Sequence, residues 1–62
     1  MQFHIETMTC GGCARGVTKA IHSVDPTAEV QADPPSHRVE VKTEAPRAAL
    51  VAALTEAGFA PS

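Results

Sequence analysis

Apolar and polar residues alternate along three short stretches of the chain, and each stretch predicts a half-buried β-strand. The first covers residues 2–6 and the second covers residues 27–32. The third covers residues 37–43 and follows a turn indicated by the Asp-Pro-Pro-Ser sequence at residues 33–36. The residues expected on the inward faces are Phe3 and Ile5, then Ala28, Val30 and Ala32, and finally Val39 and Val41.

Two further stretches carry apolar residues at helical spacing. The first runs from Cys13 to about His22, and Asp25-Pro26 closes it because the residue before a proline disfavours the helical conformation. The second covers residues 46–57, begins with a proline that a first helical turn tolerates, and stops at Gly58. The expected apolar faces are Val17, Ala20, Ile21 and Val24 in the first helix and Leu50, Ala53, Leu54 and Ala57 in the second.

Phe59 is expected to begin a last short strand, which gives the order strand, helix, strand, strand, helix, strand. A ferredoxin-like βαββαβ sandwich accommodates this order, with two helices on one face of a four-stranded antiparallel sheet. The predicted class is therefore α+β, in a single domain over residues 1–62. In that topology the Cys10–Cys13 loop and the turn at Gly58 and Phe59 are neighbours.

Composition excludes several classes of function. A net charge of -2, with five Lys and Arg residues and two aromatic residues in 62, argues against a nucleic-acid-binding protein. No apolar run approaches the roughly 20 residues that a membrane-spanning helix needs. The first six residues lack the basic start and apolar stretch of a secretory signal, so we expect a cytosolic protein. A domain this small has little room for a deep active-site cleft, and we do not expect an enzyme.

The candidate chemistry is the sequence Cys10-Gly11-Gly12-Cys13, which follows a strand and opens a helix. The unpaired N–H groups of a helix N-terminus stabilise thiolate, and we expect them to lower the pKa of both cysteines. Two soft sulfur ligands suit Cu(I), which accepts low coordination, whereas structural Zn(II) usually takes four ligands. The pair is too close in sequence to staple distant parts of the fold. The alternative is two buried cysteines without a ligand role, although such residues need no glycine-rich turn.

At these residues the sequence resembles the heavy-metal-associated domain family, which includes copper chaperones of the bacterial CopZ type and N-terminal modules of copper-pumping ATPases. The resemblance covers essentially the whole chain, and it rests on three segments: Met8-Thr9-Cys10-Gly11-Gly12-Cys13, the helix over Ala14 to Ile21, and Leu54-Thr55-Glu56-Ala57-Gly58-Phe59. It implies the βαββαβ fold, Cys10 and Cys13 as the metal ligands, and Met8 as a buried anchor of the loop.

The resemblance also implies delivery of the metal by exchange with a partner's own cysteine pair. That partner would be the metal-binding domain of a copper-transporting P-type ATPase or a copper-responsive regulator, and the carrier itself a monomer or a metal-bridged dimer. Zinc-exporting relatives carry an acidic residue where this chain has Thr9. Other members place Tyr or Lys where this chain has Phe59, which can shield the site but cannot donate a hydrogen bond to sulfur.

Three other functions fit parts of the pattern. The chain could carry another soft metal, such as zinc, cadmium or mercury, or it could be a regulatory domain cut from a metal-pumping ATPase. It could also be a thiol–disulfide oxidoreductase, since Cys-x-x-Cys is a redox motif as well. Against the redox function, the chain has no Trp and no proline clearly placed opposite the cysteines.

The histidines and the basic residues of the first helix are secondary candidates. His4 is expected to face solvent and His22 to lie at the far end of the first helix. His37 follows a turn at the metal end of the sheet and is a candidate for a weak third ligand. Arg15 and Lys19 are one helical turn apart beside the site, either as a solvated face or as a docking surface for an acidic partner.

Gly16 lies inside the first predicted helix, where glycine costs up to about 1 kcal/mol relative to alanine. Close packing against another segment, or the approach of a partner, would explain a glycine there. The sequence pattern does not distinguish between these two.

Overall fold

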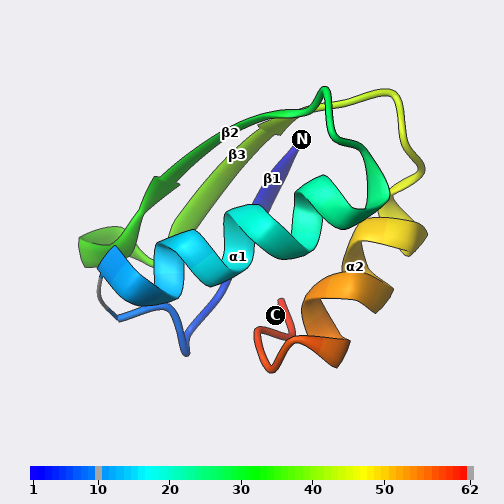
Figure 1. Cartoon of the computed structure of the whole chain (residues 1–62). Helices are drawn as coiled ribbons and strands as arrows, with labels where there is room; N and C mark the ends of the chain where they lie inside the picture. The colour runs from blue at the N-terminus through cyan, green and yellow to red at the C-terminus, as the bar shows by residue number, and fades with distance from the viewer. Residues whose placement is uncertain (10, 62) are drawn as a thin grey trace.

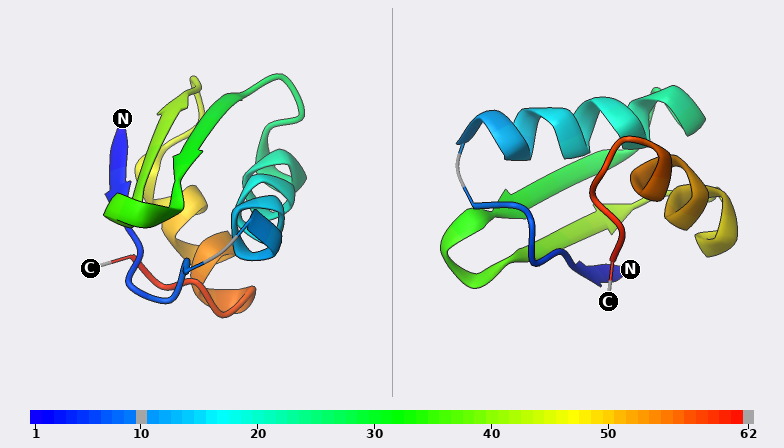
Figure 2. Two further views of the ribbon diagram at one scale, coloured as in Figure 1. Left: turned by 90° about the vertical axis from the view of Figure 1, so that its left-hand side faces the viewer. Right: turned by 90° about the horizontal axis from the view of Figure 1, so that it is seen from below.

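A computed structural model of the chain describes residues 1–9 and 11–61, so Cys10 and Ser62 lie outside the described residues. Its elements are β1 (Gln2–His4), α1 (Gly11–Val24), β2 (Glu29–Asp33), the short 3-10 helix η1 (Pro34–Ser36), β3 (Arg38–Lys42) and α2 (Arg47–Glu56). The strands form one layer, and both helices cover the same face of it (Figures 1 and 2). The predicted class, helices on one face of an antiparallel sheet, is confirmed at this level.

The sheet has the order β1-β3-β2, and both pairings are antiparallel. Val39 of β3 lies opposite Phe3 of β1 on one side and opposite Ala32 of β2 on the other. Val41, also in β3, lies opposite Val30. β3 is therefore the central strand, and its two valines are fully buried because neighbours on both sides and the helices above cover them.

The core is a single cluster beneath the two helices. Ten hydrophobic side chains among the described residues are buried: Phe3, Ile5, Met8, Val17, Ile21, Ala28, Val39, Val41, Leu50 and Leu54. Ala20, Val24, Val30, Ala32 and Val51 pack around them. The predicted inward faces of the three strands and of α1 are thus confirmed, whereas Ala57 of the second helix is exposed because it lies at the end of α2.

The expected fourth strand is wrong for the part of the chain that the structure describes. After α2 the chain closes in a Schellman motif: the N–H of Phe59 donates to the carbonyl of Leu54 (2.8 Å), and that of Gly58 donates to Thr55 (3.1 Å). Gly58 adopts a φ of 90°, which favours glycine. Phe59 has therefore already used its N–H, and Pro61 has none, so this segment cannot form a regular strand ladder.

Arg47, the first residue of α2, covers the outer edge of β1. Its Nη1 donates to the carbonyl oxygen of Gln2 (2.9 Å), and its guanidinium lies 4.3 Å from the centroid of the Phe3 ring. Because Phe3 pairs with Val39 on the inner side, the backbone groups of Gln2 face away from β3. Arg47 thus satisfies an edge carbonyl that no described strand reaches, and it adds a cation–π contact.

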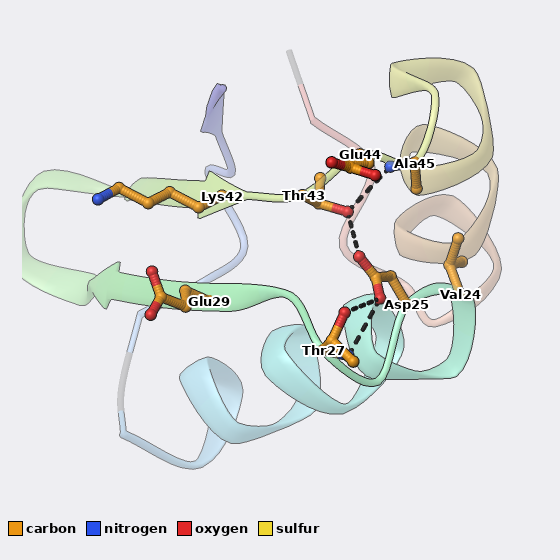
Figure 3. Close-up of a pocket in the computed structure, with 8 residues that line it drawn as sticks. All are labelled: Val24, Asp25, Thr27, Glu29, Lys42, Thr43, Glu44 and Ala45. Atoms are coloured by element: carbon orange, nitrogen blue, oxygen red, sulfur yellow. Dashed lines mark hydrogen bonds between the residues drawn. The ribbon is translucent and has the colours of Figure 1, made fainter.

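Asp25 follows the last residue of α1 and joins that end of the helix to the segment between β3 and α2 (Figure 3). Its carboxylate accepts hydrogen bonds from the Thr43 hydroxyl (2.6 Å) and from the hydroxyl (2.7 Å) and N–H (3.0 Å) of Thr27. The Thr43 hydroxyl in turn accepts from the N–H of Ala45 (3.1 Å). The bond from Thr43, followed by those from Thr27, holds the pKa of Asp25 below its ordinary value.

We predict that Met8→Ala lowers the free energy of unfolding by about 2–5 kcal/mol, because the side chain is fully buried in the core. Met8→Leu conserves the volume and should cost less than about 1.5 kcal/mol. Denaturant unfolding of the metal-free protein measures both. Equal stability of Met8→Ala and the parent chain would contradict the anchoring role.

We also predict that Thr43→Val reduces the dependence of stability on pH in acid. A lowered pKa means that the folded state favours the carboxylate, so the stabilisation is fully present above the unfolded Asp pKa of about 3.9. It is lost as the pH falls through the lowered value of Asp25. Thr55→Val is the matched control, since that hydroxyl bonds only a carbonyl of its own helix, that of Val51. The difference between Thr43→Val and the parent, measured by thermal unfolding, should shrink in acid, and a constant difference would contradict the prediction.

Candidate metal site

Cys13 is the third residue of α1, which begins at Gly11, two residues earlier than the apolar spacing predicts. The glycine pair therefore belongs to the first helical turn, and the Cys13 sulfur is held where unpaired N–H groups favour an anion. That first turn contains no acidic residue. Cys13 is half-buried and packs against the core. Cys10, the other predicted ligand, lies outside the described residues.

Two contacts hold the segment that leads into the cysteine sequence, one with the core and one with the turn after α2. Met8 is fully buried, and its N–H donates to the carbonyl of Ile5 (3.2 Å), which makes a tight turn after β1. The buried position that the resemblance implies for Met8 is therefore confirmed. The Thr7 hydroxyl donates to the carbonyl of Gly58 (3.3 Å), 51 residues away in the sequence.

The turn after α2 lies beside this segment, as the topology predicts. Thr7 bonds Gly58 on one side of the turn, and the ring of Phe59 contacts α1 at Gly16 on the other. Phe59 is half-buried and packs against the core with Cys13 and Ala14. The turn thus links the segment before the cysteines to the helix after them, and it places an apolar ring one helical turn from Cys13.

His22 lies at the far end of α1, whereas the rings of His4 and His37 lie near each other, with centroids 6.0 Å apart. His22 is in the last turn of α1, where its Nε2 donates to the carbonyl of Ala28 (2.9 Å) and ties the helix to the start of β2. His4 is largely exposed, and its Nε2 lies 3.1 Å from the Glu6 carboxylate. The predicted solvent-facing position of His4 and the remote position of His22 are confirmed.

His37 ends η1 at the same end of the sheet as the start of α1, as expected (Figure 1). Its φ is 58°, its N–H donates to Pro34 (3.1 Å) and its carbonyl accepts from Ile5 (2.8 Å). Its Nδ1 is enclosed and has no hydrogen-bond partner among the described residues. Within residues 1–9 and 11–61 no three His, Cys, Asp or Glu side chains converge on one point, so a third ligand from His37 stays a prediction.

Basic residues form a stripe on the exposed side of α1. Arg15 and Lys19 are exposed, one turn apart, and together with Ala14, Thr18 and His22 they line a shallow open hollow. The stripe begins two residues after Cys13 in α1, and its role as a docking surface stays a prediction. The hollow around Asp25 and Thr43, by contrast, lies at the far end of α1 and contains none of the predicted ligands.

Two features of the site were missed by the sequence pattern. The hydrogen bond between Thr7 and Gly58 and the contact between Phe59 and Gly16 each join residues more than 40 positions apart. The only local signal is the glycine at position 16, which costs helix stability unless something packs against it.

Among the helices of the described chain, none is long and apolar enough to cross a bilayer.

Comparison with known proteins agrees with this arrangement. The family model for the heavy-metal-associated domain matches residues 2–60. A crystal structure of a gold binding protein is 49% identical, with 98% of this chain and 94% of that chain covered and a TM-score of 0.95. The copper chaperone Atx1 from Synechocystis PCC6803 is 32% identical, with 100% and 98% covered and a TM-score of 0.96. Agrobacterium tumefaciens Atu1203 is 40% identical, with 100% and 97% covered and a TM-score of 0.88.

No curated protein matches the chain. The family match nevertheless covers nearly every residue, and solved structures 32–49% identical share the fold over at least 98% of this chain. The resemblance drawn from Met8 to Cys13 and from the end of α2 is thereby confirmed. The chain belongs to the heavy-metal-associated domain family.

Proposed function

We propose that this chain is a cytosolic Cu(I) carrier that holds one ion between Cys10 and Cys13 and passes it to a partner protein. The observation that carries the proposal is the position of Cys13 in the first turn of α1. The chain segment after α2 lies beside it: Gly58 accepts a hydrogen bond from Thr7, and Phe59 packs against the same core cluster as Cys13. Thiolates are the ligands that Cu(I) prefers. The domain over residues 1–62 acts as one carrier and performs no catalytic step of its own.

Transfer follows from the low coordination number of the ion. Two thiolates leave Cu(I) with room for a third, so a thiolate of the partner can bind before either cysteine of the carrier leaves. Each partner thiolate would form a Cu–S bond before one Cu–S bond to the carrier breaks, and the copper would stay Cu(I) throughout. Cys13 lies within α1 and Cys10 precedes its first residue, so Cys10 is the ligand that leaves first. The partner is the metal-binding domain of a copper-transporting P-type ATPase or a copper-responsive regulator.

A second cargo is supported by one comparison. The gold binding protein is 49% identical to this chain, a higher identity than the 32% of the Synechocystis copper chaperone. We therefore propose Au(I) as the alternative cargo of the same cysteine pair. Zinc is the weaker candidate, since the two cysteines supply half of the four ligands that a structural zinc ion usually takes.

We predict that Cys10→Ser and Cys13→Ser each abolish tight Cu(I) binding, because a two-thiolate site loses half of its ligands. Both variants should keep the fold. An anaerobic titration against a competing chelator measures the affinity, and repeats with Au(I) and Zn(II) rank the cargoes. Thr9→Ser is the matched control, since it alters the same segment without removing sulfur. Retention of parental Cu(I) affinity by either cysteine variant would show that the two-thiolate site is wrong.

We further predict that Arg15→Glu with Lys19→Glu slows copper transfer to an acidic partner domain, because both charges are exposed beside the site. Raising the salt concentration should slow transfer by the parent chain for the same reason. Lys42→Glu is the control, since that exposed residue lies at the end of β3 in the sheet. The loaded carrier is mixed with an apo metal-binding domain of a copper ATPase at a fixed chelator concentration. Transfer no faster than release into the chelator would contradict direct delivery.

A further inference from the structure

Gly16 occupies a position where α1 would be more stable with alanine. It is the sixth residue of the 14-residue helix, and glycine is disfavoured in a helix interior because it has more backbone freedom to lose. A Cβ built at Gly16 would approach the Phe59 ring to 3.0 Å at Cε2 and 3.2 Å at Cζ. Both separations are shorter than ordinary carbon–carbon contacts of about 3.5–4.0 Å. Because Gly16 has no side chain, the surface of α1 has a recess at this position, and the Phe59 ring lies in it.

The ring is presented to this recess by a turn that is fixed on its other sides. The N–H of Phe59 donates to Leu54 (2.8 Å) and the N–H of Gly58 donates to Thr55 (3.1 Å), so the backbone of Phe59 is held to α2. The carbonyl of Gly58 accepts from Thr7 on the segment before the cysteines. A methyl group at position 16 would consequently displace the ring, which is the movable end of the side chain, rather than the turn.

The position of the ring matters to Cys13. Residues 13 and 16 are three apart in α1 and therefore neighbours on one helix face. Cys13 and Phe59 both pack against the same core cluster, and Cys13 is only half-buried. An apolar ring seated at Gly16 thus limits the approach of reagents to the Cys13 sulfur from that side, without a hydrogen bond to it.

We propose that Gly16 is a positioning residue: by leaving room for the Phe59 ring it keeps the ring seated beside Cys13, and the pair sets how readily the Cys13 sulfur is reached. This inference rests on the proposed function only for its biological meaning, since accessibility is a property of the metal-free chain. In the carrier it governs how fast a partner thiolate or an oxidant reaches the site.

The test uses a Cys10→Ser background, in which Cys13 is the chain's one remaining thiol. We compare the rate at which a bulky aromatic disulfide reacts with Cys13 in this background and after adding Gly16→Ala. The rate is taken from the plateau at high pH, where the thiol is fully ionised, so that it reports access rather than acidity. We expect Gly16→Ala to raise the plateau rate several-fold. The far-ultraviolet circular dichroism spectrum should not change, and the unfolding midpoint should not fall.

A double-mutant cycle separates the steric pair from a general effect on the helix. Phe59→Ala should raise the rate by a similar factor, and Gly16→Ala should then add nothing. Ser23→Ala is the control for helix propensity, since it also introduces alanine into α1 at an exposed position near the other end. An unchanged plateau rate in Gly16→Ala, or the same acceleration with and without Phe59, would overturn the proposal. These outcomes are independent of whether the parent chain binds Cu(I), so failure of the proposed function is recognised separately by titration.

Discussion

Burial of Met8 determines where the cysteine sequence leaves the sheet and enters α1. The side chain reaches the same core that holds β1, β3 and both helices, and it does so two residues before Cys10. The buried side chains of the described residues form one cluster, so repacking around Met8 involves both helices and the sheet. The sulfur of Cys13 is therefore positioned by hydrophobic packing, and the first turn of α1 then supplies the electrostatic environment.

Most of the fold follows from local periodicity, and the two errors of the sequence-based prediction both lie where glycines begin or end a helix. Alternation identifies the strands because Phe3, Ile5, Val39 and Val41 really do face one core, and helical spacing identifies both helices for the same reason. Gly58 predicts the end of the second helix, but a strand cannot follow it directly, because the Schellman closure uses the N–H of Phe59 that a fourth strand would need. The spacing predicts the start of α1 two residues late, because the glycine pair at residues 11 and 12 is more typical of a turn than of a helix.

The candidate site could be predicted only in part. Cys13 stands out because the two cysteines are closely spaced and open a helix, and Met8 follows from the family resemblance. The contacts that hold the neighbouring turn depend on where two distant segments meet in space, which no local pattern encodes. The candidate metal ligands can therefore be predicted from the sequence. The contacts around them, from Thr7 to Gly58 and from Phe59 to Gly16, are found only once the end of α2 is placed beside α1.

The contact of Arg47 with β1 has a consequence for how the molecule meets others. An uncovered strand edge is a template on which a second chain can add a strand, and such additions are slow to reverse and prone to grow into aggregates. Arg47 occupies the outward carbonyl of Gln2 and places a positive charge on that edge. Arg47 therefore makes the outer edge of β1 a poorer template for strand addition and lowers the tendency of that edge to pair with another chain.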